Sequence, residues 1–161
     1  MRSTASLTLW LFVIGTSLVL GAGLYENLVV VPLWSTGAPA SLAAGNPLLE
    51  VQVRAGHVFW SYFTPIPGFI ALLALATSFG TPRRHLAWRV AASGLFIAVM
   101  IATLAYFRPQ AIAMVVEHGA GLTPEALAKE AHHWAALNWV RVFAVAVSLA
   151  MGVRALLLPL R

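Results

Sequence analysis

The stretch that decides the fold runs from residue 7 to residue 33 and reads LTLWLFVIGTSLVLGAGLYENLVVVPL. It is longer than the roughly 20 apolar residues that an α-helix needs to cross a bilayer. Three further apolar stretches follow, at residues 58–79, 86–107 and 134–153. The sequence therefore predicts an all-α fold. A single integral membrane domain over residues 1–161 would hold four transmembrane helices, at 7–33, 58–79, 86–107 and 123–158.

The composition supports a membrane protein and excludes several classes of soluble protein. The 161 residues are 60% hydrophobic and 9% charged, whereas a typical soluble domain is about 25% charged. The formal charge of +5 reflects few acids rather than a basic run, so no nucleic-acid partner is expected. The chain has no cysteine, which excludes thiolate catalysis, Cys-ligated zinc or iron–sulfur sites, and disulfide relays.

The placement of basic residues predicts the orientation in the membrane. Six arginines lie near the termini or around the second connection, namely Arg2, Arg83, Arg84, Arg89, Arg154 and Arg161. Three basic residues lie in the other two connections, namely Arg54, Arg108 and Lys129. By the positive-inside rule, both termini are expected in the cytoplasm, with the chain in a bacterial inner membrane. A cleaved signal peptide is the alternative for the first stretch, since residues 21–23 are small. The apolar residues that follow favour a span.

The connections between the spans differ in their expected structure. Residues 35–56 are expected to be mostly loop, with a short helix at 48–54. The third connection is expected to be helical over 110–118 and to break at residues 119–121. Thr123, Pro124 and Glu125 then supply an N-cap, a first-turn proline and an acid that the helix dipole favours. The fourth helix should therefore begin well outside the membrane.

Two ionisable residues lie within the predicted spans, where a charge is costly. Counting eight residues back from Trp34 at the outer aromatic belt, Glu26 lies about 12 Å deep at a rise of 1.5 Å per residue. Counting seven residues on from Trp134, Arg141 lies about 10 Å deep. We therefore predict an ion pair between Glu26 and Arg141. It would be either a structural contact between the first and fourth helices or part of a functional site. In either case, removing one partner would leave a buried charge.

Further polar and aromatic residues share helix faces at the same depth. On the fourth span, Trp134, Asn138 and Arg141 share one face. The second and third spans bring more such residues to this level: His57, Trp60, Ser61, Thr64, Thr103 and Tyr106. Two prolines, at positions 65 and 67, free backbone carbonyls nearby. Together these features predict a pocket in the outer half of the bundle for a small, mostly apolar ligand.

The histidines leave two metal-binding alternatives open. Glu130 and His133 form one Glu-x-x-His motif of the kind that di-iron bundles use in pairs, but the sequence has no second copy. A haem would need His57 to face His132 or His133, and these positions lie at helix entrances rather than within the spans. We favour interfacial roles for these histidines, as polar caps or proton carriers. No metal and no cofactor are therefore expected.

Four short segments give the chain a resemblance to a known family. They read GAGLYENLVVVPLW (21–34), FWSYFTPIPGF (59–69), LAYFRP (104–109) and HHWAALNWVRV (132–142). In the order and spacing of these segments, the chain resembles the anthrone oxygenase-like family of small four-helix bacterial integral membrane proteins. The resemblance covers all four predicted helices and implies the same fold.

The resemblance also implies an activity and a set of site residues. Members with an assigned role insert oxygen into a polycyclic anthrone without a metal or flavin. On that analogy, Glu26 or His133 would be the base that forms the substrate anion, and Arg141 and Asn138 would donate to the developing oxyanion. The substrate-binding residues expected from the resemblance and from the depth argument together are Tyr25, His57, Trp60, Ser61, Thr64, Thr103, Tyr106, Trp134 and Asn138.

The sequence thus leads to one preferred function and two alternatives. The preferred function is a cofactor-independent oxygenase or oxidoreductase that acts on a lipophilic aromatic or quinone-like molecule. One alternative is a non-catalytic membrane subunit, or a lipid-, quinone- or pigment-binding protein within a larger complex. The other is a haem- or metal-binding membrane redox protein. The expected partners are the lipid bilayer and a lipophilic small molecule, and both a homo-oligomer and a membrane-complex partner stay open.

Overall fold

The computed structural model describes residues 2–158, without the side chains of residues 2, 3, 48, 50, 52–54 and 57. The chain is 86% helical, and the described residues form no β-strand. Its helices and helical turns are, in chain order, α1 (Arg2–Tyr25), η1 (Glu26–Val30), α2 (Val31–Ser35), η2 (Ala40–Leu42), α3 (Pro47–Phe63), α4 (Pro65–Ser78), α5 (Arg83–Ala102), η3 (Thr103–Phe107), α6 (Arg108–Ala111), η4 (Ile112–Val116) and α7 (Pro124–Leu157).

Four helical segments are long and apolar enough to cross a membrane. They are Thr4–Ser35, Val58–Ser78, Arg83–Val116 and Pro124–Leu157. Each contains or closely matches one of the four stretches predicted from the sequence, so the all-α fold with four spans is confirmed. By length and composition, the chain is an integral membrane protein.

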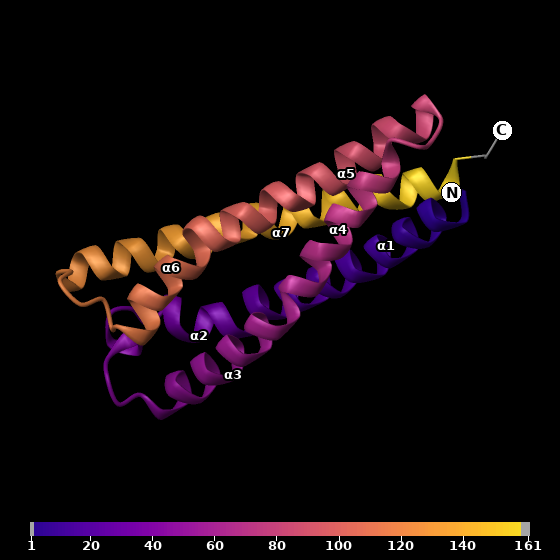
Figure 1. The fold of residues 1–161 in the computed structure, drawn as a ribbon. Coiled ribbons are helices and arrows are strands. Elements are labelled where there is room, and N and C mark those ends of the chain that lie inside the picture. Colours follow the sequence, from indigo (N-terminus) through magenta and orange to yellow (C-terminus); the bar gives the residue numbers. More distant parts are fainter. Residues whose placement is uncertain (1, 159–161) are drawn as a thin grey trace.

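The four spans form a bundle in which each span packs against two others. Helix α1 packs against α4 and α7, and α5 packs against the same two helices. Figure 1 shows that both ends of the described chain lie at one end of the bundle, together with the α4–α5 connection. We call this end the terminal end, and the opposite end, which holds the two longer connections, the distal end.

An apolar core fills the terminal half of the bundle. It includes Leu9 and Phe12 from α1, Phe96 from α5 and Val145 from α7, all nearly inaccessible to solvent. At Gly152, an added Cβ would lie 3.1 Å from the Phe12 ring. This glycine therefore lets α1 and α7 approach closely, as small residues do at membrane helix interfaces.

Arg89 lies inside the terminal half, although the sequence analysis placed it among the cytoplasmic arginines around the second connection. Its side chain is 5% exposed and donates hydrogen bonds to the Ala5 carbonyl (2.8 Å), Ser78 Oγ (3.2 Å) and Thr77 Oγ1 (3.3 Å). These partners come from α1 and α4, so Arg89 joins three helices. Because α5 begins at Arg83 rather than near residue 86, Arg89 lies well inside the helix.

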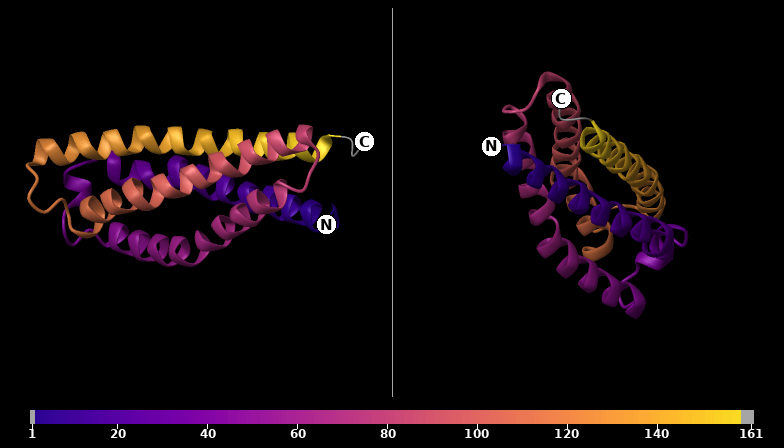
Figure 2. Two further views of the ribbon diagram at one scale, coloured as in Figure 1. Left: turned by 45° about the horizontal axis from the view of Figure 1, so that its top comes forward. Right: turned by 90° about the vertical axis from the view of Figure 1, so that its right-hand side faces the viewer.

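The second span differs from its prediction before its start and in its middle. Residues 47–56 are helical rather than loop, because α3 begins at Pro47 and continues into the span. The expected short helix at 48–54 is thus the first part of α3. The span breaks at Thr64, between α3 and Pro65. Pro65 has no N–H and so cannot donate the next helical hydrogen bond. Figure 2 shows that α3, on the distal side of this break, bends away from the other helices.

Three π-helical turns interrupt the first and third spans of the described chain, all in the distal half. Two of them, η1 and η3, each end two residues before a proline. A proline ring clashes with the carbonyl four residues before it in an α-helix and offers no N–H. Each turn instead closes with a longer hydrogen bond: Val31 N–H donates to the Glu26 carbonyl, and Arg108 N–H donates to the Thr103 carbonyl. Such π-bulges are frequent at functional sites.

Candidate functional site

The predicted ion pair between Glu26 and Arg141 is confirmed. Arg141 Nη2 lies 2.8 Å from Glu26 Oε2, joining the first and fourth spans in the distal half. The side chain of Arg141 keeps 12% of its surface exposed, and that of Glu26 keeps 21%. The pair is therefore largely shielded from solvent but still borders open space.

The π-turn η1 determines which residues of the first span face inward. Glu26 and Asn27 begin this turn, and both point into the bundle, with Asn27 only 3% exposed. Gly23, one turn earlier, would place a Cβ 3.2 Å from Val142, so its lack of a side chain keeps α1 close to α7 here. This close approach brings Glu26 within reach of Arg141.

Two aromatic rings flank the Arg141 guanidinium. Its central carbon lies 5.3 Å from the centre of the Phe107 ring and 6.0 Å from that of the Trp60 ring. Both distances lie within the range for cation–π attraction. Among the described residues, Glu26 is the hydrogen-bond partner found for this side chain, although a guanidinium carries five N–H donors. Arg141 therefore keeps donors available for a ligand.

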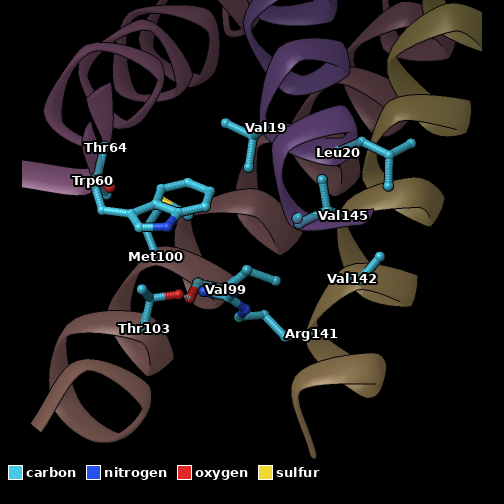
Figure 3. Close-up of a pocket in the computed structure, with 11 residues that line it drawn as sticks. Val19, Leu20, Trp60, Thr64, Val99, Met100, Thr103, Arg141, Val142 and Val145 are labelled. Atoms are coloured by element: carbon cyan, nitrogen blue, oxygen red, sulfur yellow. Dashed lines mark hydrogen bonds between the residues drawn. The ribbon is translucent and has the colours of Figure 1, made fainter. Parts of the chain in front are cut away.

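A cavity of about 410 Å³ lies against this ion pair. This volume is within the range of small-molecule sites. Its walls come from all four spans and are mainly apolar, with Trp34, Trp60, Phe107 and Trp134 among them. A smaller hollow of about 20 Å³ shares Trp60 and Arg141 with it. Figure 3 shows this hollow, with the Arg141 side chain extending from α7 toward Thr103.

Most of the residues predicted to form the site line this cavity. They are Glu26, Trp60, Ser61, Thr64, Thr103, Trp134 and Arg141. Trp134 is buried, and its Nε1 donates to the Phe107 carbonyl at 3.0 Å, which ties α7 to the π-turn η3. The structure therefore brings together the two charged groups, three hydroxyls and the aromatic side chains that the sequence placed at this depth.

The other five predicted site residues comprise four that do not line the cavity and one, His57, whose side chain the structure does not describe. Tyr25 is 63% exposed on the outside of α1, and His133 is exposed on α7. Tyr106 is partly buried and packs beside the Phe107 ring, at 5.2 Å between ring centres. His57 lies in α3, but its side chain is outside the described part of the structure.

The fifth of these residues, Asn138, is fully buried behind the ion pair. Its Nδ2 donates to Asn27 Oδ1 at 2.9 Å. Sequence reasoning missed Asn27, although its position next to Glu26 and five residues before Pro32 could have drawn attention to it. Asn27 Nδ2 and Asn138 Oδ1 are both buried without a hydrogen-bond partner in the structure. This amide pair therefore fixes the first span against the fourth but retains unused polar capacity.

The metal-binding alternatives find no cluster of donor groups. Among the described side chains, no group of three or more His, Cys, Asp or Glu residues is placed to hold a metal ion. Within the Glu-x-x-His motif, His133 is exposed on the outside of α7. His132 Nδ1 forms a hydrogen bond with the Ala128 carbonyl of its own helix, at 2.7 Å.

Sequence reasoning also missed the apolar wall that the third span contributes beyond residue 103. Phe107, Ile112 and Val115 all line the cavity, and the π-turns η3 and η4 set which side chains of this segment face inward. Comparison with known proteins adds no further assignment: no protein-family model matches the chain, and neither the curated proteins nor the solved structures contain a significant match.

Proposed function

We propose that this protein binds a planar, lipophilic molecule that carries an oxygen atom, and that it acts on this molecule as a cofactor-independent oxygenase. The observation that carries the proposal is the Glu26–Arg141 pair at the edge of a cavity of about 410 Å³ whose walls are mainly apolar. A guanidinium between two aromatic rings, with spare N–H donors, suits an aromatic ring bearing a carbonyl or phenolate oxygen.

The same residues suit the chemistry that the resemblance implies. Glu26 would remove a proton from an acidic ring methylene, and Arg141 would stabilise the resulting enolate oxygen. The substrate anion would then react with dioxygen, so that the methylene becomes a carbonyl and the second oxygen atom leaves as water. Of the two bases expected from the sequence, Glu26 lines the cavity and His133 does not, so we assign the role of base to Glu26. Family membership itself is part of this proposal.

We also propose an orientation in a bacterial inner membrane. Arg83 and Arg84 begin α5 and Arg154 lies in the last turn of α7, so all three lie at the terminal end. Glu117 and Glu125 lie at the distal end, between η4 and the first turn of α7. The positive-inside rule then places both termini in the cytoplasm and the cavity in the outer half of the bilayer.

The test uses the protein reconstituted in lipid nanodiscs. Addition of a hydroxylated anthrone should cause oxygen consumption above the spontaneous rate, with formation of the corresponding quinone. Glu26→Gln and Arg141→Lys should each abolish this increase, because one removes the base and the other removes the planar guanidinium. His133→Ala is the matched control: it alters an ionisable residue on the same helix as Arg141, and activity should be unchanged.

A second candidate function is binding without catalysis. Among the described side chains that line the cavity, Glu26 is the carboxylate. Its ion pair with Arg141 reduces its availability as a base. In that case, the wild-type protein would retain a quinone or similar molecule through purification but would not accelerate oxygen consumption. That outcome would refute the proposed oxygenase activity but would support the proposal that the cavity binds a ligand.

A further inference from the structure

The opening of the cavity lies on the side of the bundle rather than at its end. Three cavity-lining residues are also large apolar residues with half or more of their surface exposed: Phe69 (62%), Leu104 (56%) and Val116 (50%). All three belong to the membrane-spanning segments Val58–Ser78 and Arg83–Val116. A side chain that both lines a cavity and is exposed marks the boundary between the cavity and its surroundings. For Phe69 and Leu104, which lie inside their spans, those surroundings would be the hydrocarbon of the bilayer, whereas Val116 ends its span.

The course of α3 explains why the bundle is open at this point. On the distal side of the break at Thr64, α3 packs mainly against α4 and the π-turn η4. Figure 2 shows that α3 diverges there from the remaining helices. Leu49 is buried in an apolar cluster that also holds Trp34, Val115 and Trp134, so the distal end of α3 is held in place. The space under the middle of α3 is thus part of the cavity, where Gly56 contributes no side chain to fill it.

We propose that the ligand of this cavity enters laterally from the bilayer, between α4 and the third span, past Phe69, Leu104 and Val116. This inference rests on the proposed function, because it requires the cavity to bind a lipophilic molecule. It restricts the substrate class to membrane-dissolved molecules and excludes water-soluble analogues of the same ring system. The oxygen-bearing end of the ligand would lead, since the guanidinium of Arg141 lies at the deep side of the cavity.

The chemistry of the opening supports this route. Phe69, Leu104 and Val116 are apolar, so a hydrophobic molecule would pass from lipid to cavity without crossing water. Arg108, which is exposed at the start of α6, is the charged residue at this boundary. It lies between Leu104 and Val116 along the third span, and its long side chain can extend toward the headgroup region. The opening is therefore apolar at Phe69, Leu104 and Val116, with one charged side chain among the described residues at its boundary.

The chain has no cysteine, so a single introduced cysteine can be labelled uniquely. Leu104→Cys places the label at the opening. Ile101→Cys is the matched control, because Ile101 lies on α5 with 61% exposure but does not line the cavity. Each variant is labelled with a bulky maleimide or with a methylthio group and reconstituted in phosphatidylcholine nanodiscs. The probe is 2,3-dimethyl-1,4-naphthoquinone, whose binding is followed by quenching of the cavity tryptophans Trp34, Trp60 and Trp134.

We expect the bulky label at position 104 to abolish quenching, and the methylthio group there and both labels at position 101 to preserve it. A water-soluble naphthoquinone sulfonate should not quench the wild-type protein. Equal quenching with the bulky label at both positions, or quenching by the sulfonate, would overturn lateral access. Failure of the dimethyl probe to quench the wild-type protein would instead refute the proposed binding function, and lateral access with it. Thermal unfolding of each labelled variant shows whether a lost signal reflects a lost fold.

Discussion

Replacement of Glu26 by Gln tests how strongly the ion pair contributes to the distal half of the bundle. The amide keeps the shape of the side chain and can still accept a hydrogen bond from Arg141, but the guanidinium charge loses its partner. Removing one partner of a fully buried pair costs about 3–5 kcal/mol. Here the two side chains are 12% and 21% exposed and border a cavity, and the Phe107 ring also attracts the cation. We therefore expect a loss of about 2 kcal/mol in the free energy of unfolding.

The attribution to the pair itself requires a double-mutant cycle. Glu26→Gln, Arg141→Gln and the double variant are compared by denaturant unfolding in detergent micelles, followed by tryptophan fluorescence. The double variant should lose less stability than the sum of the single variants by about 1 kcal/mol or more, because it leaves no unpaired charge. Additive losses would refute the coupling and would show that each side chain contributes through contacts other than their mutual ion pair.

A further variant, Arg141→Lys, separates the effect of the positive charge from that of the planar guanidinium. Lysine keeps the positive charge toward Glu26, so stability should fall less than in Glu26→Gln. It lacks the planar group that lies against Trp60 and Phe107 and presents fewer donors, so quinone binding should still weaken. If binding survives this substitution, Arg141 acts as a counter-charge for Glu26 rather than as a ligand donor.

Two further predictions concern buried polar contacts. Arg89→Ala should lower the free energy of unfolding by roughly 2–4 kcal/mol, because it removes hydrogen bonds such as that to the Ala5 carbonyl and leaves a void. The control is Arg84→Ala, which changes an exposed arginine in the same helix and should have no measurable effect. Equal effects of the two substitutions would contradict the burial of Arg89. Asn138→Ala should lower the free energy of unfolding by about 1–3 kcal/mol, because it leaves Asn27 Oδ1 buried without a donor. Replacing both asparagines by leucine should lower the free energy of unfolding by less. A larger decrease in the double variant would show that the amides are needed as a pair. Thermal unfolding in detergent measures all four variants.

The sequence was sufficient for features that depend on length, hydropathy and depth. Four apolar stretches predict the four spans, and Thr123 predicts the start of α7, where its side chain accepts a hydrogen bond from the Ala126 N–H. The Glu26–Arg141 pair was predicted from depth alone. Depth along a helix requires only the rise per residue, and a π-turn hardly changes the sum over a few turns.

The sequence was insufficient where the result depends on rotation about a helix axis. Tyr25 and Asn27 lie about 200° apart on a helix, so one is exposed and the other is buried. The spacing alone does not give the rotation of the first span, and therefore does not tell which of the two faces inward. The exposure of His133 was within reach of pattern reasoning, however. Leu127, Ala131 and Trp134 form the buried face of α7, and His133 lies about 100° away from Trp134 around the helix.

The two halves of the bundle differ in a way that bears on how variants should be interpreted. The described π-turns, the break at Thr64 and the ion pair all lie in the distal half, whereas the terminal half combines regular helices with a dense apolar core and the Arg89 contacts. Irregular backbone reduces stability and is frequently retained where function requires it, so its distribution supports the distal half as the functional one. Because the terminal core contains neither Glu26 nor Arg141, it should stay folded when the pair is broken. A loss of ligand binding in Glu26→Gln would then report on the cavity rather than on a general loss of structure.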